Sequence, residues 1–246
     1  MGIFDQAGWQ VRFEWGLEGV EALAPISDVL IVVDVLRFTT TVSAAIEQGA
    51  IIYPYQWKDA SVDDFAIRVG ALTVEASAHR GYSLSPLSMN KIPRGTRLVL
   101  PSPNGSAASF AAQRVSKVVL AGCLRNAKAV AEAAQKLGES IAVIAAGERW
   151  KESGTLRPAV EDLVGAGAIL SYLGQTKSPE ALVAESTFYS VRNRIQEFLL
   201  QSSSGRELTV MGRGDDIEFA SAIDASKAVP VLSGEAFVRW ESEEQA

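Results

Sequence analysis

The sequence predicts an α/β fold with a mixed, largely parallel sheet flanked by helices, and two observations support this. Between residues 34 and 148, a short apolar strand, a polar turn and a helix follow one another at least three times, which is the order of a parallel sheet with helical crossovers. Residues 29–33, VLIVV, are apolar throughout and mostly β-branched, as in a strand buried on both faces of such a sheet. Sheets of this kind bind ligands beyond the carboxyl ends of their strands, so we expect the functional site there.

The N-terminal third is expected to alternate between strands and helices. Residues 9–15 alternate apolar with polar side chains, which predicts a half-exposed strand that ends in a turn at residues 16–19. The buried strand passes into a helix within about five residues, because apolar side chains then recur at helical spacing. In the next strand, residues 51–55, Pro54 lacks an N–H group and favours an edge or a strand end. The other elements of this part are a polar helix at residues 59–69 and a strand at residues 72–75.

The middle and C-terminal parts continue this pattern. Residues 79–93 are irregular, and loops of this length in a compact domain often carry function. Three strands then each lead through a polar turn to a helix, the strands at residues 97–100, 117–121 and 141–145 and the helices at residues 107–113, 127–137 and 158–173. The last expected elements are a long helical stretch at residues 178–200, a break at residues 202–205, a short element from residue 205, a helix at residues 217–223 and a strand at residues 229–232. We expect one α/β domain over residues 1–246, in which the part from about residue 175 is a candidate for a smaller subdomain.

Composition and charge exclude several classes of protein. With 246 residues, 48% of them hydrophobic, the chain can bury a sizeable core and is not disordered. A net charge of −6 without a Lys/Arg-rich block argues against nucleic acid as a partner, whereas a few basic side chains in a cleft can still attract a small anion. Cys123 is the single cysteine, and we find neither a signal peptide nor a membrane-spanning run, so we expect a cytoplasmic protein without disulfides. The single histidine, His79, excludes the usual Ser-His-Asp and multi-histidine metal sites.

Asp34 and Arg37 follow the buried strand and are the first candidate site residues. A carboxylate, a guanidinium and three threonines from Thr39 onward stand where a strand turns into a helix. The helix N-terminus and the arginine favour an oxyanion, while the aspartate favours a cation, so the group suits a phosphate and a divalent metal together. The alternative is that Asp34 only caps the helix.

Polar residues at the ends of other strands predict a larger site at the same edge of the sheet. The residues at or just past the proposed strand ends are Asp34, Glu75, Asn104, Asn126 and Glu148. Parallel strands bring their carboxyl ends to one rim, where these side chains meet. Together with Arg37, Arg125 and Arg149, they predict a site in which carboxylates bind a hard metal and arginines bind an oxyanion.

Some of these residues have a structural alternative. The turn from Asn104 to Ser106 offers N–H groups and a hydroxyl to an anion, and it equally suits a turn with an N-cap. Cys123 lies near a helix start, although a small buried cysteine is the commoner case. Gly165 and Gly167 lie inside a predicted helix, which indicates close packing and not a dinucleotide fingerprint.

Several blocks of the sequence resemble the 2-phosphosulfolactate phosphatase family. The first three blocks are Asp34 to Arg37 with the threonines that follow, Ser102 to Ser106, and Gly122 to Asn126. The fourth block begins at Ala146 to Glu148 and continues with Glu161, Asp162 and residues 165–168. The end of the chain resembles the family in Gly205-Arg206, in Asp215 to Phe219 and in Val229 to Val231. The similarity thus runs in order from about residue 28 to about residue 233. The resemblance implies a cytoplasmic, Mg²⁺-dependent phosphomonoester hydrolase that converts 2-phosphosulfolactate to sulfolactate and phosphate, a step towards coenzyme M.

Two segments depart from the family's pattern. Where members commonly read Gly-Phe-Asp-Leu-Gly-Asn-Ser-Pro, residues 81–86 read GYSLSP, so Ser83 replaces an aspartate. Residues 149–158 replace a shorter linker, and their two arginines and one lysine are candidates for recognising a different acid. We therefore expect 2-phosphosulfolactate or a related 2-phospho acid as the substrate. The alternative is a non-catalytic protein that kept the fold and binds a small anion.

Residue chemistry assigns candidate roles within such a site. The metal candidates, for one Mg²⁺ that needs few protein carboxylates, are Asp34, Glu75, Glu161 and Asp162. The catalytic candidates are Asp34, Arg37 and Glu148, and the substrate and phosphate-binding candidates are Thr39, Asn104, Gly105, Ser106, Arg125, Asn126 and Arg149. The nucleophile is either Asp34 or a water molecule, and Leu36 favours water because aspartate nucleophiles usually stand in an Asp-x-Asp pair. Edge strands and the apolar content make a homo-oligomer an option.

Overall fold

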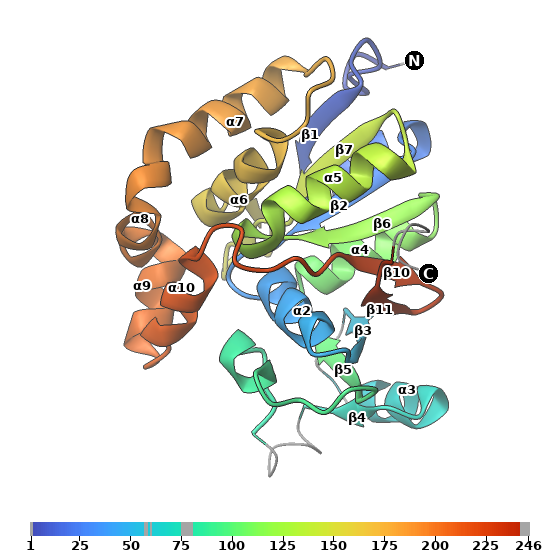
Figure 1. Ribbon diagram of the computed structural model, residues 1–246, viewed down its shortest axis with the longest axis vertical. Coiled ribbons are helices and arrows are strands. Elements are labelled where there is room, and N and C mark those ends of the chain that lie inside the picture. Colours follow the sequence, from blue (N-terminus) through green and yellow to red (C-terminus); the bar gives the residue numbers. More distant parts are fainter. Residues whose placement is uncertain (1, 57–58, 60, 75–80, 242–246) are drawn as a thin grey trace.

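The computed structural model describes residues 2–56, 59, 61–74 and 81–241, and the structural statements below concern these residues. Nine strands form one sheet with helices against both of its faces, which confirms the predicted α/β class (Figure 1). Among the described helices, none is both long and apolar enough to cross a membrane.

The sheet consists of two parallel parts joined by an antiparallel hairpin. The first part has the order β1 (Val11–Trp15), β7 (Ile141–Ala145), β2 (Val29–Val33) and β6 (Val118–Gly122). The second part has the order β3 (Ile51–Tyr55), β5 (Arg97–Pro101) and β4 (Leu72–Thr73). Between them lie β10 (Pro230–Ser233) and β11 (Ala236–Arg239), each bridged to its outer neighbour at one residue pair.

Alternation along β2 explains how the sheet is covered. Val29, Ile31 and Val33 pack in the same core cluster as α5 (Ala127–Leu137) and α6 (Val160–Leu170). The residues between them, Leu30 and Val32, pack on the other face with α1 (Gly16–Leu23) and α4 (Gly105–Gln113). Because successive side chains of a strand point to opposite faces, an unbroken apolar run requires helices on both sides.

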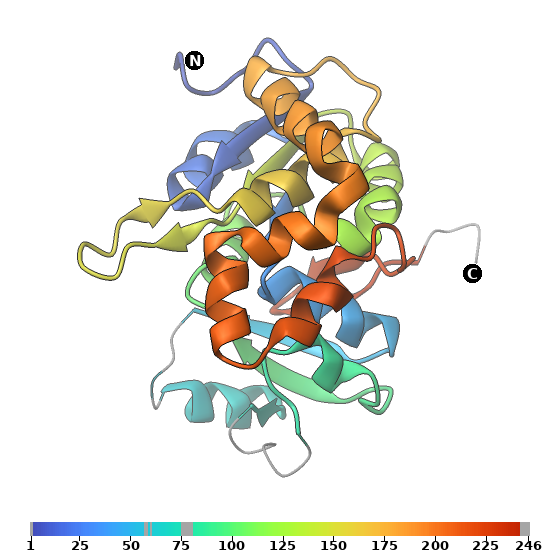
Figure 2. The ribbon, with the colours of Figure 1, turned by 90° about the vertical axis from the view of Figure 1, so that its left-hand side faces the viewer.

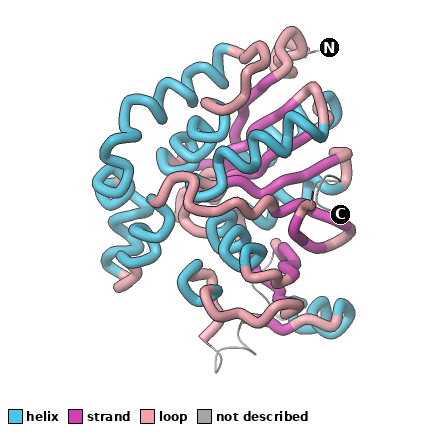
Figure 3. Tube along the Cα trace, viewed as in Figure 1, coloured by secondary structure: helices cyan, strands magenta, loops and turns pink. Residues whose placement is uncertain are grey.

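The remaining helices lie outside this central part. α2 (Phe38–Glu47) follows β2, and α3 (Ser61–Val69) lies near β4. α7 (Pro179–Val191), α8 (Ile195–Gln201), α9 (Ser203–Val210) and α10 (Gly214–Ser221) form a curved row at one side of the sheet (Figures 1 and 3). The short 3-10 helices are Ala24–Ile26, Pro86–Met89, Leu124–Asn126 and Arg192–Arg194. The small strands β8 (Glu148–Arg149) and β9 (Leu156–Arg157) form a hairpin that projects from the body of the molecule (Figure 2).

Several predicted elements are corrected by the structure. The turn expected at residues 16–19 is the first turn of α1, because Gly16 adopts φ +60° and lets a helix begin directly after β1. Of the two positions expected from Pro54, the strand end is confirmed, because Pro54 is the last residue but one of β3, and the edge is wrong, because β3 lies between β11 and β5. Its pairing with β11 involves only Ile52, so the missing N–H of Pro54 interrupts no continuous ladder there. The stretch expected at residues 178–200 is divided into α7 and α8, the element from residue 205 is part of α9, and β11 was not predicted.

The two glycines of α6 allow close packing, as predicted. A Cβ atom at Gly167 would lie 2.1 Å from the carbonyl oxygen of Ala184 in α7, and one at Gly165 would lie 2.4 Å from Val35 Cγ2. These distances are far below van der Waals contact, so larger residues would push α6 away from its neighbours. This matters for function because α6 begins with Glu161 and Asp162.

Candidate active site

The register of the parallel strands brings their polar ends together. Val33 of β2 pairs with Gly122 of β6 and with Ala145 of β7. The residues that follow these three positions, with Asp34 first among them, therefore leave the sheet at one edge.

Asp34 joins two turns through its carboxylate. Oδ1 accepts a hydrogen bond of 3.0 Å from the backbone N–H of Phe38, the first residue of α2. Oδ2 accepts one of 2.9 Å from the N–H of Gly105, the first residue of α4, and one of 3.4 Å from Ser102 Oγ. Asp34 thus serves the start of α2, as the capping alternative states, and it also binds a turn 71 residues further along the chain.

Asp162 forms a second connection of the same kind. Its Oδ1 accepts a hydrogen bond of 2.7 Å from the N–H of Val35, and its Oδ2 accepts one of 2.9 Å from the N–H of Gly147. The first turn of α6 therefore fixes both the turn after β2 and the turn after β7. Asp162 is 3% exposed, so these bonds lie in the interior.

Glu148 and Glu161 complete a group of four acids. Glu148 Oε2 accepts a hydrogen bond of 2.8 Å from Asn104 Nδ2, and the residue is half-buried. Glu161 is 2% exposed, and its carboxylate forms no hydrogen bond with any described residue. The Glu161 oxygens are not among the fully buried side-chain atoms without a partner, so they keep some contact with solvent and can accept a ligand.

Burial and the charges of neighbouring acids raise the pKa of Asp34, Glu148 and Asp162. Burial raises the pKa of Asp34 to about 6, although the N–H groups of Phe38 and Gly105 oppose the shift and the charge of Glu161 adds to it. Burial, followed by the charge of Asp34, raises the pKa of Glu148 to about 7. The pKa of Asp162 is raised well above its usual range, first by burial and then by the charges of Asp34 and Glu161.

Such a group fits a divalent cation in its chemistry. Four carboxylates repel one another unless a positive charge lies among them, and hard oxygen ligands are what Mg²⁺ prefers. Among the described residues, however, no three acidic, histidine or cysteine side chains are arranged as a ready-made metal centre. Mg²⁺ commonly keeps several waters and takes one or two carboxylates, so the residues present fit this ion as a partly hydrated one.

A cavity of about 280 Å³ opens beside Glu148, and the other three acids do not line it. Glu148 and Asn104 form part of its wall, together with residues from the first turn of α1 and from the hairpin of β8 and β9. Its lining residues are Gly16, Leu17, Glu18, Asn104, Ala108, Ala146, Glu148, Arg149, Gly154, Thr155 and Leu156. A small molecule in this cavity would contact Glu148 directly and would be covered by the hairpin.

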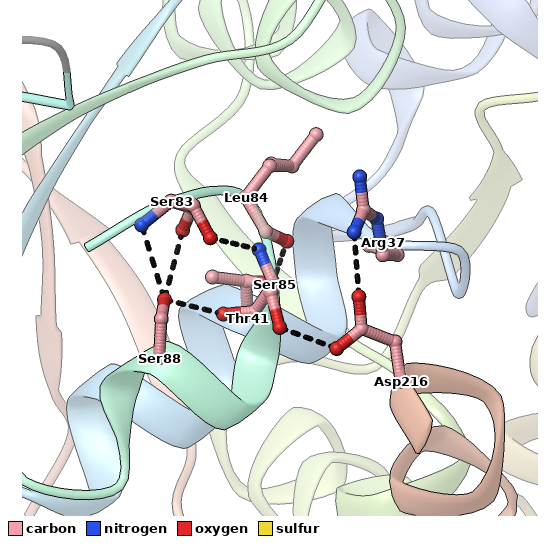
Figure 4. Close-up of polar contacts among 7 residues, drawn as sticks. All are labelled: Arg37, Thr41, Ser83, Leu84, Ser85, Ser88 and Asp216. Atoms are coloured by element: carbon pink, nitrogen blue, oxygen red, sulfur yellow. Dashed lines mark hydrogen bonds and ion pairs between the residues drawn. The ribbon is translucent and has the colours of Figure 1, made fainter. Parts of the chain in front are cut away.

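Arg37 and Arg125 lie in the turns after β2 and β6, and both contact α10. Arg37 Nη1 lies 2.5 Å from Oδ2 of Asp216 in α10, and Oδ1 of Asp216 accepts a hydrogen bond from the Ser85 hydroxyl (Figure 4). The guanidinium of Arg125 lies 3.7 Å from the centre of the Phe219 ring, and its Nη1 donates to the Phe219 carbonyl over 3.0 Å. Asp216 and Ser85 were not among the predicted site residues.

The other predicted residues donate hydrogen bonds to backbone carbonyls or lie outside the described part of the chain. Thr39 Oγ1 donates to the Asp34 carbonyl, Ser106 Oγ donates to the Leu100 carbonyl, and Asn126 Nδ2 donates to the carbonyls of Ala121 and Ala228. These three side chains are buried and stabilise the turns around the site. Arg149 is exposed on the hairpin and donates to the Gly154 carbonyl. Glu75 and His79 lie outside the described residues.

Cys123 is buried at the same edge, in agreement with the structural alternative. It is fully buried, and burial raises the pKa of its thiol. The thiolate is the reactive form of cysteine, so this residue is not activated as a nucleophile.

Comparison with known proteins places this chain in a family of phosphatases. The family model for 2-phosphosulpholactate phosphatase matches residues 18–235, so the chain belongs to this family and is a hydrolase. A "2-phosphosulfolactate phosphatase" of Methanothermobacter thermautotrophicus is 30% identical over 213 residues, which cover 83% of this chain and 87% of that protein. A "Probable 2-phosphosulfolactate phosphatase" of Thermus thermophilus is 31% identical, with 84% of this chain and 89% of that protein covered. A protein of the same name from Thermotoga maritima is also 31% identical, with 88% and 96% covered.

Proposed function

We propose that this protein is a Mg²⁺-dependent phosphomonoester hydrolase that acts on 2-phosphosulfolactate or a related 2-phospho acid and releases the 2-hydroxy acid and phosphate. The observation that carries the proposal is the group of four mostly buried acids, of which Glu148 lines a cavity and Glu161 forms no hydrogen bond with a described residue. The names of its relatives support the substrate class. Within a cell, we place the reaction in the cytoplasm as a step towards coenzyme M.

Asp34 and Glu161 are the proposed ligands of the metal. Asp34 Oδ1 accepts one hydrogen bond, from the N–H of Phe38, and keeps a further lone pair, whereas Oδ2 accepts from both Gly105 and Ser102. The Glu161 carboxylate accepts no hydrogen bond from a described residue. Asp162 sits next to them and holds the two turns in place. When bound, Mg²⁺ would neutralise the charge that develops on the phosphoryl oxygens and lower the pKa of a water molecule.

Glu148 is the proposed proton donor. Its pKa of about 7 keeps a proton on a large fraction of molecules near neutral pH, and it lines the cavity in which the leaving oxygen would lie. Asn104 donates to Oε2 and thereby fixes the side chain. The leaving alkoxide takes this proton, and the product leaves as an alcohol.

Water is the proposed nucleophile. Both oxygens of Asp34 accept backbone N–H bonds, and the side chain is 6% exposed, so Asp34 is held still and is not free to attack phosphorus. Arg37 and Arg125 are the proposed ligands of the phosphoryl oxygens, since guanidinium groups bind such oxygens in a bidentate manner. Arg149, at the wall of the cavity, is the proposed partner of the substrate's second acidic group.

Phosphate release from a panel of small phosphomonoesters tests this function. The panel contains phosphosulfolactate, phospholactate and phosphoglycerate, each with and without Mg²⁺, and the wild type is compared with Asp34→Asn and with the control Glu132→Gln on the exposed side of α5. We expect metal-dependent turnover that is lost in Asp34→Asn and kept in the control. If the folded wild type binds these acids and leaves every one intact, the alternative of a small-anion-binding protein replaces the enzyme.

A further inference from the structure

Helix α10 contacts two of the three candidate arginines, Arg37 and Arg125, although it lies near the C-terminal end of the described chain. Its residue Asp216 binds Arg37, which is 179 positions earlier in the sequence. Its residue Phe219 binds Arg125, which is 94 positions earlier. Asp216 and Phe219 are three positions apart and therefore lie on one face of the helix, so a single face of α10 holds both guanidinium groups.

The Arg37 contact is fixed at a second point. The Asp216 side chain is 2% exposed, and its other oxygen accepts a hydrogen bond from the Ser85 hydroxyl. The segment that carries Ser85 is tied to α2 as well, because Thr41 Oγ1 donates to the Leu84 carbonyl over 2.7 Å (Figure 4). Three segments far apart in sequence thus determine where the Arg37 side chain points. Such an ion pair leaves the other guanidinium donors of Arg37 for a further ligand.

The Arg125 contact has a different chemistry. Phe219 offers the face of its ring and its backbone carbonyl, neither of which carries a formal charge. Arg125 is 8% exposed, its Nε has no hydrogen-bond partner, and no salt bridge joins it to a described carboxylate. A buried cation without a counter-charge is unfavourable unless an anion binds beside it. Arg125 is therefore oriented by α10 and keeps its charge for a ligand.

From these contacts we propose that α10 is the positioning element of the phosphate site: Asp216 sets the direction of Arg37, and Phe219 sets that of Arg125. The proposal rests on the function proposed above and adds to it that two residues outside the predicted site control phosphate affinity. The ligand is a phosphoryl group, either on the substrate or as free phosphate. Misplacing a binding group by about 1 Å can lower activity on the order of 100-fold, so these contacts matter for rate as well as affinity.

A double-mutant cycle between Arg37 and Asp216 tests the proposal. The variants are Arg37→Ala, Asp216→Asn and the pair, with Glu218→Gln on the exposed side of α10 as the control. We expect Asp216→Asn to lower kcat/KM and to weaken inhibition by inorganic phosphate by about 10- to 100-fold. In the Arg37→Ala background the same substitution is expected to change neither quantity, because its effect passes through Arg37.

A purely structural role of Asp216 gives a different result. Its loss would then lower kcat/KM by the same factor in both backgrounds, and that outcome would overturn the proposal. If Asp216→Asn does not fold, Ser85→Ala replaces it in the same double-mutant cycle, because it removes only the hydrogen bond from Ser85 to the Asp216 carboxylate. Thermal unfolding of each variant identifies those that fold.

The second contact is tested in the same way. Phe219→Leu removes the ring and keeps the carbonyl, and we expect it to weaken phosphate binding in the wild type and to leave it unchanged in Arg125→Ala. If wild-type protein hydrolyses no phosphomonoester, the proposed function fails. The affinity for inorganic phosphate, measured by calorimetry on the same variants, then still tests both mutant cycles. If the wild type hydrolyses its substrate and both α10 variants behave like Glu218→Gln, the positioning proposal alone fails.

Discussion

At the scale of single residues, the environment of each carboxyl group decides its role. Asp34 and Glu148 lie close enough for the charge of one to raise the pKa of the other, yet they differ in access. Asp34 is enclosed by N–H donors and suits a fixed negative charge, whereas Glu148 faces the cavity and suits proton exchange. Neither difference is visible in the amino-acid type. Both follow from which strand ends meet at the edge of the sheet.

The pH dependence of turnover tests the role of Glu148. Its pKa is raised to about 7, so the protonated form is present below pH 7 and is lost as the pH rises through that value. With Glu148 as the proton donor, kcat should fall about tenfold per pH unit above this pKa, and bound Mg²⁺ should move the descending limb below pH 7 because it offsets the charge of Asp34. Arg157 lowers this pKa through its charge, so Arg157→Gln should move the descending limb to higher pH.

The measurement is a rate profile between pH 5 and 9 at saturating substrate and Mg²⁺. Lys128→Gln is the matched control, because it removes a positive charge from an exposed residue of α5, and it should leave the pH profile unchanged. An unchanged limb in Arg157→Gln would contradict the assignment of this limb to Glu148.

The sequence indicates the acids that the structure brings together, but it does not indicate Asp216 and Ser85, which hold Arg37. Asp34 and Glu148 lie at strand ends, where the pattern of the chain indicates their position. Asp216 lies in the first turn of a helix, where acids are common for electrostatic reasons alone, and Ser85 lies in an irregular segment. Their bond joins positions 131 residues apart, and no local pattern encodes such a pair.

At the scale of elements, the approach of α4 to the turn after β2 determines the geometry of Asp34. Four strands lie between β2 and β5 in the sheet. The chain that leaves β5 must therefore run back along the edge of the sheet towards β2 before it reaches Asp34. The N–H of Gly105 completes the contact. Helix α4 was predicted from residue 107 and begins at Gly105, because the residues before the alanines belong to its first turn. The periodicity of the sequence locates the helix but not the direction from which its N-terminus meets Asp34.

The substitution Gly105→Ala tests this approach. A Cβ atom at this position would lie 2.4 Å from Phe38 Cδ1 and 2.6 Å from Asp34 Oδ2, so either α4 or the Asp34 carboxylate must move. We expect a loss of stability of about 1–3 kcal/mol, as for other overpacked interiors. We also expect kcat to fall by about 10- to 100-fold, because a group near the reacting atoms is displaced.

Chemical denaturation and phosphate release measure the two effects. Gly174→Ala is the matched control, since a Cβ atom there meets nothing within 4 Å and the backbone has no positive φ. Gly105→Ala with wild-type stability and turnover would show that α4 adjusts without disturbing Asp34.

At the scale of the whole molecule, the sheet and its covering helices collect acids from distant segments into one interior group. Asp34 follows β2, Glu148 opens the hairpin after β7, and Glu161 and Asp162 begin α6. The fold thereby places negative charges where water cannot fully solvate them, which raises the pKa of three of these acids. The α/β class and the positions of most strands along the chain could be predicted from apolar runs and turns. The joining hairpin of β10 and β11 could not, because each of its strands meets its outer neighbour at a single pair.

This arrangement has a consequence for stability that involves pH and metal together. An acid whose folded-state pKa is raised binds its proton more tightly in the folded state, so its contribution to stability is present at low pH and is lost as the pH rises through the raised pKa. With Asp34 at about 6 and Glu148 at about 7, the loss extends from about pH 4 to above pH 7. Each unit of pKa shift corresponds to about 1.4 kcal/mol. In the absence of metal, we expect Tm to fall by about 5–10 °C between pH 5 and pH 8.

Addition of Mg²⁺ should reverse this trend, because a metal binds deprotonated carboxylates and therefore competes with protons. At a concentration 100 times its Kd, a ligand of the folded state adds about 2.7 kcal/mol, so we expect Mg²⁺ to raise Tm clearly at pH 8 and only slightly at pH 5. Thermal unfolding in EDTA and in MgCl₂ at both pH values measures the difference. Glu161→Gln should lose most of the Mg²⁺ effect, and Glu132→Gln should keep it. An equal rise at both pH values, or an unchanged response of Glu161→Gln, would place Mg²⁺ away from these acids and would remove the metal from the proposed mechanism.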